Sequence, residues 1–233
     1  MIHFPKMTPA PSRKETIGGF ILMALTLFVT PSIIYIINDH LPQSMTTGMI
    51  NVVYYIVNFL LTILVFRRFL SHSLKAALSR PFSVMWHALL GYLGFQALTE
   101  LLGILIFYVY PDFSNVNDDT IFTMLEQDLL PLAMSTIFLV PLAEESLYRG
   151  LIFRGMMDKR PVAAYLVSMA AFAAIHVMGY IGSVSPLVLL LCFVQYLPAG
   201  YCLCWCYRQT GTILCPVLMH TIVNASSIFI YLR

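Results

Sequence analysis

The chain has 233 residues, of which 59% are hydrophobic and 10% are charged, and its formal net charge is +2. Because soluble domains carry about 25% charged residues, this composition excludes a soluble globular fold. No run of Lys and Arg indicates nucleic-acid binding. The composition predicts an all-α protein that contacts the lipid bilayer and forms a single transmembrane domain over residues 1–233.

The apolar residues occur in runs of about 20, long enough to cross the hydrocarbon core of a bilayer as helices. Basic residues precede the first run, but this run is longer than the core of a signal peptide and no cleavage motif follows, so we expect a retained span. We expect about seven spans, with eight as the alternative count, at residues 17–38, 48–66, 84–110, 129–157, 161–180, 187–207 and 211–231.

Two segments between these spans have a distinct character. Residues 67–82 are basic and amphipathic, which is typical of a helix lying in the membrane interface. Residues 111–128 carry five acidic residues, and we expect them to form a solvated connector. Residues 1–128 then form a helical lead-in, and residues 129–231 hold the helices that carry the candidate site.

The positive charges predict an orientation. With seven spans, twelve of the 13 Lys and Arg residues fall on one side of the membrane, and only Arg233 falls on the other. Basic loops remain in the cytoplasm. We therefore expect a multi-pass protein of a bacterial plasma membrane, with its N-terminus in the cytoplasm and its C-terminus outside.

Three clusters of functional side chains interrupt the apolar segments, each on a different expected helix. Ionisable residues inside spans are costly and are candidates for function. Glu145 and Arg149 are four residues apart, so they share a helix face and can pair. Glu144 is rotated by about 100° from Glu145, which leaves it as the carboxylate free for chemistry. The clusters are Glu144, Glu145 and Arg149; Phe172 and His176; and His220 and Asn224.

Spacing along the chain predicts that the clusters meet. Glu144 and His176 each lie about 22 Å from the turn near 158–161, and His220 lies about 16 Å from the turn near 208–210, at 1.5 Å per helical residue. We expect a shared cavity in the cytoplasmic half of the bundle. Taken singly, the histidines fit packing residues, the Glu145–Arg149 pair fits a structural ion pair, and Asn224 fits an interhelical hydrogen bond.

Gln96 and Glu100 are a further polar pair, one turn apart in the third span. They have no partner cluster. Structural hydrogen bonding and a place in the cavity lining both remain open for them.

Three sequence patterns in this order carry a resemblance to a known family. The stretch "EESLYR" matches E-E-x-x-x-R, "FAAIH" matches F-x-x-x-H, and "HTIVN" matches H-x-x-x-N. Together they resemble the CAAX-protease and bacteriocin-processing family, also called the CPBP or Abi family, whose members are intramembrane endopeptidases. The resemblance covers about residues 140–224.

The resemblance implies roles for individual residues. Glu144 and His176 would activate a water molecule, and His220 and Asn224 would stabilise the oxyanion. Glu145 and Arg149 would hold the site together, with Phe172 beside them. Amide hydrolysis needs a base for water and donors where negative charge develops, and these residue types supply both.

The resemblance also bears on cofactors and substrates. Zinc is left open, with Glu144, His176 and His220 as its ligands, because Glu and His are ordinary zinc ligands and the family is described as metal-dependent. The expected substrate is a peptide precursor, a prenylated tail or a membrane protein, delivered near the cytoplasmic face.

Two other functions fit parts of the sequence. One is a non-catalytic module of the same fold that confers bacteriocin immunity or binds a membrane sensor protein as its partner. The other is a proton-coupled carrier that uses Glu144 and the histidines as a relay, although the chain lacks the internal repeat common in carriers.

Overall fold

The computed structural model describes residues 5–233; residues 1–4, the start of the expected lead-in, lie outside this part. The described residues form helices and no strand, apart from an isolated bridge between Ile181 and Val184. In chain order the helices are α1 (Arg13–Phe28), α2 (Thr30–Asp39), α3 (Thr47–Val65), α4 (Arg67–Leu78), α5 (Pro81–Val109), α6 (Val116–Phe138), α7 (Val140–Glu145), the π-helix η1 (Ser146–Arg154), α8 (Gly155–Met157), α9 (Pro161–Met178), α10 (Pro186–Thr210) and α11 (Leu214–Tyr231).

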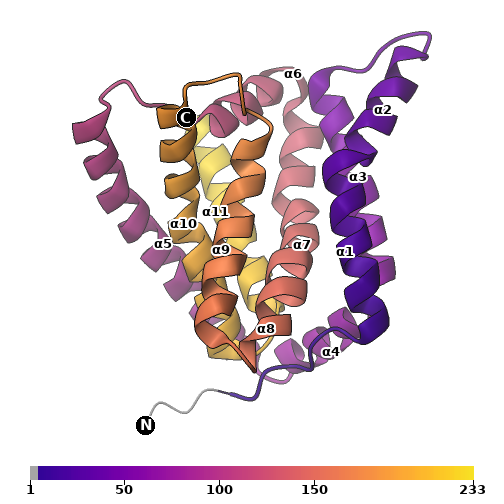
Figure 1. The fold of residues 1–233 in the computed structure, drawn as a ribbon, viewed down its shortest axis with the longest axis vertical. Coiled ribbons are helices and arrows are strands. Elements are labelled where there is room, and N and C mark those ends of the chain that lie inside the picture. The colour runs from indigo at the N-terminus through magenta and orange to yellow at the C-terminus, as the bar shows by residue number, and fades with distance from the viewer. Residues whose placement is uncertain (1–4) are drawn as a thin grey trace.

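The helices form one bundle whose long members run roughly parallel to a common axis (Figure 1). Among the described residues, six helical stretches are long and apolar enough to cross a membrane, and the bent pair of α1 and α2 makes a seventh. The N-terminal segment and the C-terminus lie at opposite ends of the bundle, as an odd number of crossings requires (Figure 1). The predicted all-α polytopic bundle is confirmed.

The first predicted span, 17–38, is broken in the structure. The helices α1 and α2 meet at Val29 with a bend of 43°. Pro31 follows in the first turn of α2, where its ring and missing N–H interrupt the hydrogen bonds of a continuous helix. This bend lies against the large cavity described below, whose lining includes Thr26, Phe28 and Pro31.

The segment 111–128 was predicted to be a solvated connector, and this prediction is wrong for most of its length. α6 begins at Val116, capped by Asn115, whose side chain accepts hydrogen bonds from the N–H groups of Asn117 and Asp118. Met124 and Leu125 of this helix are buried. The acidic residues near its start favour the positive end of the helix dipole, so a charged segment still forms a packed helix.

The fourth predicted span, 129–157, is not one regular helix. α6 is kinked at Asp128, just before this span, and a break at Leu139 within it precedes α7, which has Pro141 in its first turn. The π-helix η1 follows directly after Glu145, and all nine of its residues are buried. Within it, the Tyr148 carbonyl accepts a hydrogen bond of 2.8 Å from Ser168 Oγ on α9. π-helical turns are rare and often occur at functional sites.

The short helix α4 lies across the end of the bundle where the N-terminal segment runs, as expected for an interfacial segment (Figure 1). Glu15 of α1 accepts hydrogen bonds from the backbone N–H groups of Arg68 and Phe69 at 3.1 and 2.9 Å. This carboxylate therefore satisfies donors at the start of α4 that have no partner within the helix.

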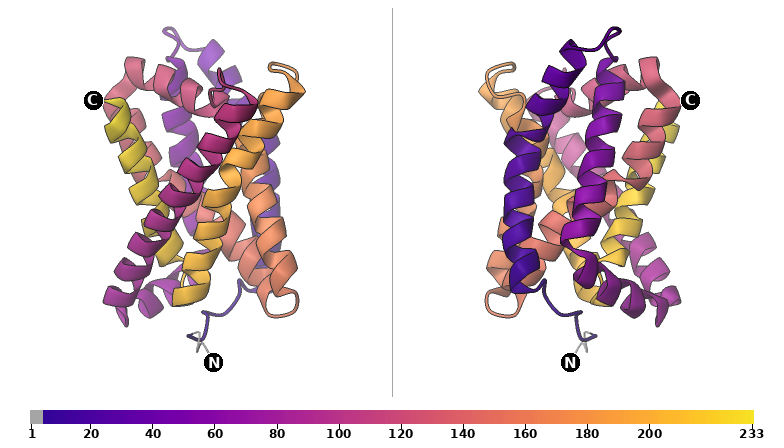
Figure 2. Two further views of the ribbon diagram at one scale, coloured as in Figure 1. Left: turned by 90° about the vertical axis from the view of Figure 1, so that its left-hand side faces the viewer. Right: turned by 90° about the vertical axis from the view of Figure 1, so that its right-hand side faces the viewer.

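Two close helix contacts shape the core around the site. Figure 2 shows α5 running obliquely across the bundle, where it packs against α10 and α11. A Cβ atom at Gly91 of α5 would overlap Cys206 Sγ of α10, and one at Gly200 of α10 would lie 3.1 Å from the Met169 Cα atom of α9. Glycine at these two positions lets the helices approach.

Candidate active site

A cavity of about 670 Å³ opens between the helices and gathers the sequence-predicted residues. Its lining comes from segments far apart in the chain, from α1 to α11. The four residues predicted to be catalytic and Phe172 all line it: Glu144, Phe172, His176, His220 and Asn224. Glu145 and Arg149 lie behind this wall, and both side chains are fully buried.

The predicted pairing of Glu145 with Arg149 is observed. Arg149 Nη1 lies 3.2 Å from Glu145 Oε1, Nη2 donates to the Gly200 carbonyl at 3.4 Å, and the guanidinium stacks 4.3 Å from the centre of the Phe172 ring. Arg149, which counted among the positive charges of a loop, is instead completely buried inside the bundle. Its charge is matched there by the carboxylate one helical turn earlier, so it can be buried.

His220 joins this pair, a contact that spacing along the chain could not show. His220 Nδ1 lies 2.9 Å from the same Oε1 atom of Glu145. A carboxylate oxygen accepts, so Nδ1 carries the proton and Nε2 is the nitrogen left for the cavity. Glu145 of α7 thus links Arg149 of η1 to His220 of α11 and orients the His220 ring.

His176 is oriented in a similar way by its own helix. Its Nδ1 donates to the Phe172 carbonyl at 2.8 Å, so the neutral ring has an unprotonated Nε2 atom able to accept a proton. The ring stacks on Tyr196 of α10, with centroids 4.2 Å apart, and lies 4.6 Å from the Phe172 ring. Tyr196 therefore fixes a face of the imidazole.

Glu144 differs from its neighbour Glu145 as the helical rotation predicts. It lines the large cavity, and its Oε2 atom has no hydrogen-bond partner among the described residues. Glu144 is thus a carboxylate with a free oxygen, while Glu145 is held by two cationic or ionisable partners.

Asn224 makes the interhelical contact that sequence reasoning had kept as an alternative. Its Nδ2 donates to the Thr136 carbonyl of α6 at 2.9 Å. An amide nitrogen carries two hydrogens, so this bond leaves one N–H for the cavity that Asn224 lines.

A polar group at one end of the cavity was missed by sequence reasoning. Tyr196 Oη donates to Asp118 Oδ1 at 2.8 Å and also contacts Asn115, while Asn115 Nδ2 donates to Gln195 Oε1 at 2.6 Å. These four residues are ordinary polar positions whose partners lie about 80 residues away, so no local pattern marked them. The sequence left the role of the polar pair Gln96 and Glu100 open. Gln96 lines the cavity, whereas Glu100 is not part of the lining and is exposed.

The expected location of the cavity in the cytoplasmic half stays a prediction, and the predicted site residues differ in their depth along the bundle. His176 lies in the last turn of α9, at the end of the helix remote from the turn at 158–160. The cavity lining also includes Asn115, which caps the start of α6, Gly179, which follows α9, and Ile230, near the end of α11. α9 has only 18 residues, about 27 Å of helix, so a rise of about 22 Å uses most of its length.

The arrangement does not fit the zinc site that was left open. Among residues 5–233, no three His, Cys, Asp or Glu side chains lie close enough to hold a metal ion. Glu144, His176 and His220 line one cavity but do not converge on a shared point. No chemical step is therefore assigned to a metal.

Fold and cavity together define a polytopic helical membrane protein with a polar site enclosed among its helices. A family model described as "Type II CAAX prenyl endopeptidase Rce1-like" matches residues 126–226, a region that contains every residue of the three motifs. The match agrees with the family that the motifs indicated, and it supports in general terms an intramembrane endopeptidase of the CAAX type. No curated protein and no solved structure matches the chain.

Proposed function

We propose that the chain is an intramembrane endopeptidase in which Glu144 and His176 activate a water molecule. The observation that carries this proposal is the contrast between two adjacent carboxylates. Glu145, whose Oε2 also lacks a partner, is bound through Oε1 to Arg149 and His220 and does not line the large cavity, whereas Glu144 lines this cavity and has no ion-pair partner among the described residues. A general base needs a free lone pair within reach of water. Nε2 of neutral His176 supplies a second acceptor on the same cavity wall.

In the proposed reaction, the water oxygen forms a bond with the carbonyl carbon of the scissile peptide. One water proton passes to Glu144 or His176, and the carbonyl oxygen becomes an oxyanion. When the C–N bond breaks, the held proton moves to the departing amine. Atoms and charge balance without a cofactor, so one pair of groups serves as base and then as acid.

His220 and Asn224 are the proposed donors to the oxyanion. The free N–H of Asn224 is available once Thr136 has taken the other. Donation from His220 Nε2 requires the doubly protonated ring, whose charge the Glu145 carboxylate at 2.9 Å would balance. Donors held in place before the reaction stabilise the developing charge without reorganisation.

The proposed substrate is a peptide tail held in the membrane by an apolar group such as a prenyl chain. Support comes from the family description and from apolar side chains that share the cavity lining with the polar ones, among them Phe95, Phe122 and Ile228. The cavity reaches the end of the bundle remote from the basic loops. If those loops are cytoplasmic, the substrate approaches from the opposite face.

The test is cleavage of a farnesylated CAAX peptide by the purified protein in phospholipid nanodiscs, with the unprenylated peptide for comparison. Glu144→Gln keeps the shape of the side chain and removes the base, so cleavage should fall by about 10²-fold or more. Glu100→Gln makes the same chemical change outside the cavity and should leave turnover within about two-fold. Turnover of Glu144→Gln within a few-fold of wild type would refute the role of Glu144, and no cleavage by the wild type would refute the peptidase proposal.

A further inference from the structure

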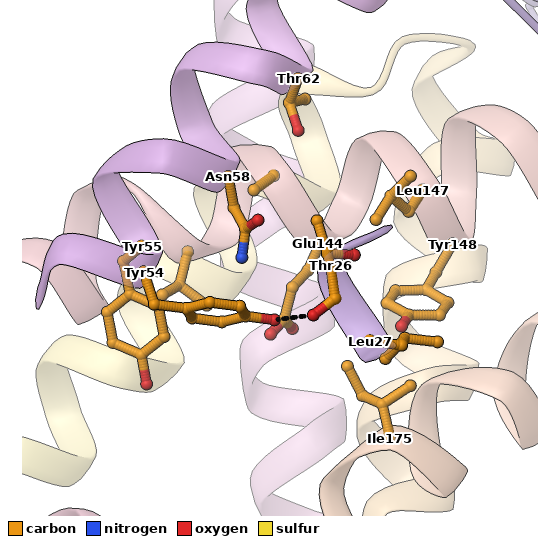
Figure 3. Close-up of a pocket in the computed structure, with 12 residues that line it drawn as sticks. Thr26, Leu27, Tyr54, Tyr55, Asn58, Thr62, Glu144, Leu147, Tyr148 and Ile175 are labelled. Carbon is orange, nitrogen blue, oxygen red and sulfur yellow. Dashed lines mark hydrogen bonds between the residues drawn. The ribbon is translucent and has the colours of Figure 1, made fainter. Parts of the chain in front are cut away.

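A second, smaller cavity of about 50 Å³ adjoins Glu144 on the side of the lead-in helices (Figure 3). It lies between α1, α3, α7 and η1. Glu144 and six other residues line both this pocket and the large cavity, so the two spaces meet beside the proposed base. Polar residues contributed by the lead-in helices include Thr26, Tyr54, Asn58 and Thr62.

Two acceptor atoms in this pocket lack a donor. Asn58 Oδ1 and Glu144 Oε2 are both buried without a hydrogen-bond partner among the described residues. Asn58 is only 8% exposed, and Figure 3 shows its side chain reaching from α3 into the space beside Glu144. A buried acceptor without a partner destabilises the fold, so two of them beside one cavity call for a donor.

The orientation of the Asn58 amide is set by its neighbour on the preceding turn. The Tyr54 hydroxyl donates to the Thr26 carbonyl at 3.1 Å, which leaves its oxygen able to accept. The Asn58 side chain lies beside this hydroxyl in the same pocket, and a hydroxyl that already donates can accept only from the amide N–H₂ group. The amide oxygen of Asn58 is therefore the atom that faces the pocket.

Neither acceptor can satisfy the other, because neither carries a hydrogen. A water molecule has two hydrogens and can donate to both. A buried water needs about 10–15 Å³ and two to four polar partners, and this pocket supplies the room and the partners.

We propose that Asn58 holds a water molecule against Glu144 Oε2 and that this pocket supplies the water consumed in peptide hydrolysis. The inference rests on the proposed function and extends the site beyond residues 126–226, because Asn58 belongs to the lead-in helices. Substrate that fills the large cavity blocks the path of water from that side. A pocket beside the base keeps a water in contact with Glu144 while the peptide is bound.

The first arm of the test measures kinetics of peptide cleavage. Asn58→Leu has a similar volume but no acceptor, so kcat should fall by about 10²-fold with KM within about two-fold, since the water is misplaced and peptide binding is unchanged. Asn58→Ser restores an oxygen and should recover most of the loss. Ser73→Ala is the matched control: it removes another buried oxygen without a partner, on α4 far from the pocket, and should leave kcat unchanged.

The second arm detects the water without any need for activity. Hydroxyl radicals generated by X-rays from bound water oxidise the side chains next to it. Leu147 lines the pocket and is 7% exposed, so it should be oxidised in the wild type and protected in Asn58→Leu. Leu132, which is fully buried and lines neither cavity, should stay unmodified in both.

The outcomes separate this inference from the proposed function. Protection of Leu147 in the wild type, or a kcat of Asn58→Leu within two-fold of wild type, would overturn the water site or its role while leaving the peptidase in place. A wild type that shows the predicted oxidation of Leu147 and cleaves no peptide would support the bound water and refute the peptidase.

Discussion

Replacing Arg149 by Ala should destabilise the protein more than it changes the chemistry. The substitution removes the contact to Glu145 at 3.2 Å, the bond to the Gly200 carbonyl and the stacking on Phe172. Breaking one side of a buried ion pair costs about 3–5 kcal/mol, because the other charge is left without compensation. His220 still contacts Glu145 at 2.9 Å, so we expect the lower end of that range, about 3 kcal/mol.

Thermal unfolding in detergent measures this effect. For a chain of this size, 1 kcal/mol corresponds to about 2–4 °C, so the melting temperature should fall by about 6–12 °C. Arg68→Ala, which removes an exposed arginine on α4, is the control and should change stability by less than about 0.5 kcal/mol. If Arg149→Ala melts within about 2 °C of wild type, the buried pair does not stabilise the fold. An inactive variant with normal melting would instead make Arg149 a residue that acts on the substrate.

Three further predictions concern the oxyanion, metal and orientation. Asn224→Ala should lower kcat per folded molecule by about 10²–10³-fold with KM nearly unchanged. Wild-type turnover in the folded fraction would show that Asn224 serves only its structural hydrogen bond to the Thr136 carbonyl. Dialysis against a zinc chelator should leave cleavage unchanged, whereas loss of activity restored by zinc would contradict the arrangement of the ligands. An impermeant thiol reagent should label the Ser227→Cys variant in intact cells if the C-terminal end of the bundle faces outward, because position 227 lines the cavity and is exposed. The five native cysteines are buried and should not react. Labelling only in inverted vesicles would show that this end faces the cytoplasm.

Much of the architecture follows from local properties of the chain. A helix buries its own backbone hydrogen bonds, so runs of about 20 apolar residues predict spans directly. The pairing of Glu145 with Arg149 and the separation of Glu144 from them follow from helical rotation alone, and the structure shows both. The motifs around Glu144, His176 and His220 also indicated the family without any knowledge of packing.

Local signals failed where packing decides the outcome. The charged segment 111–128 forms a helix because Asn115 caps it and its apolar face is buried, and neither condition is visible in its average composition. Near the breaks at Pro31 and Pro141 and within the π-helix η1, side chains of other helices donate to the backbone carbonyls of Thr26, Thr136 and Tyr148, and these donors come from distant parts of the chain. Rise per residue placed His176 correctly along its helix, but it did not show where that helix ends.

The contacts between distant helices were decided only by the tertiary structure. His220 meets Glu145 across 75 residues, Asn224 meets Thr136 across 88, and Asn58 faces the pocket beside Glu144 from a helix outside the family match. Periodicity determines which face of a helix a side chain occupies, but it leaves open which other helix that face meets. Close approaches such as those at Gly91 and Gly200 settle that choice, since packing complementarity acts on pairs of surfaces rather than on the sequence of either one.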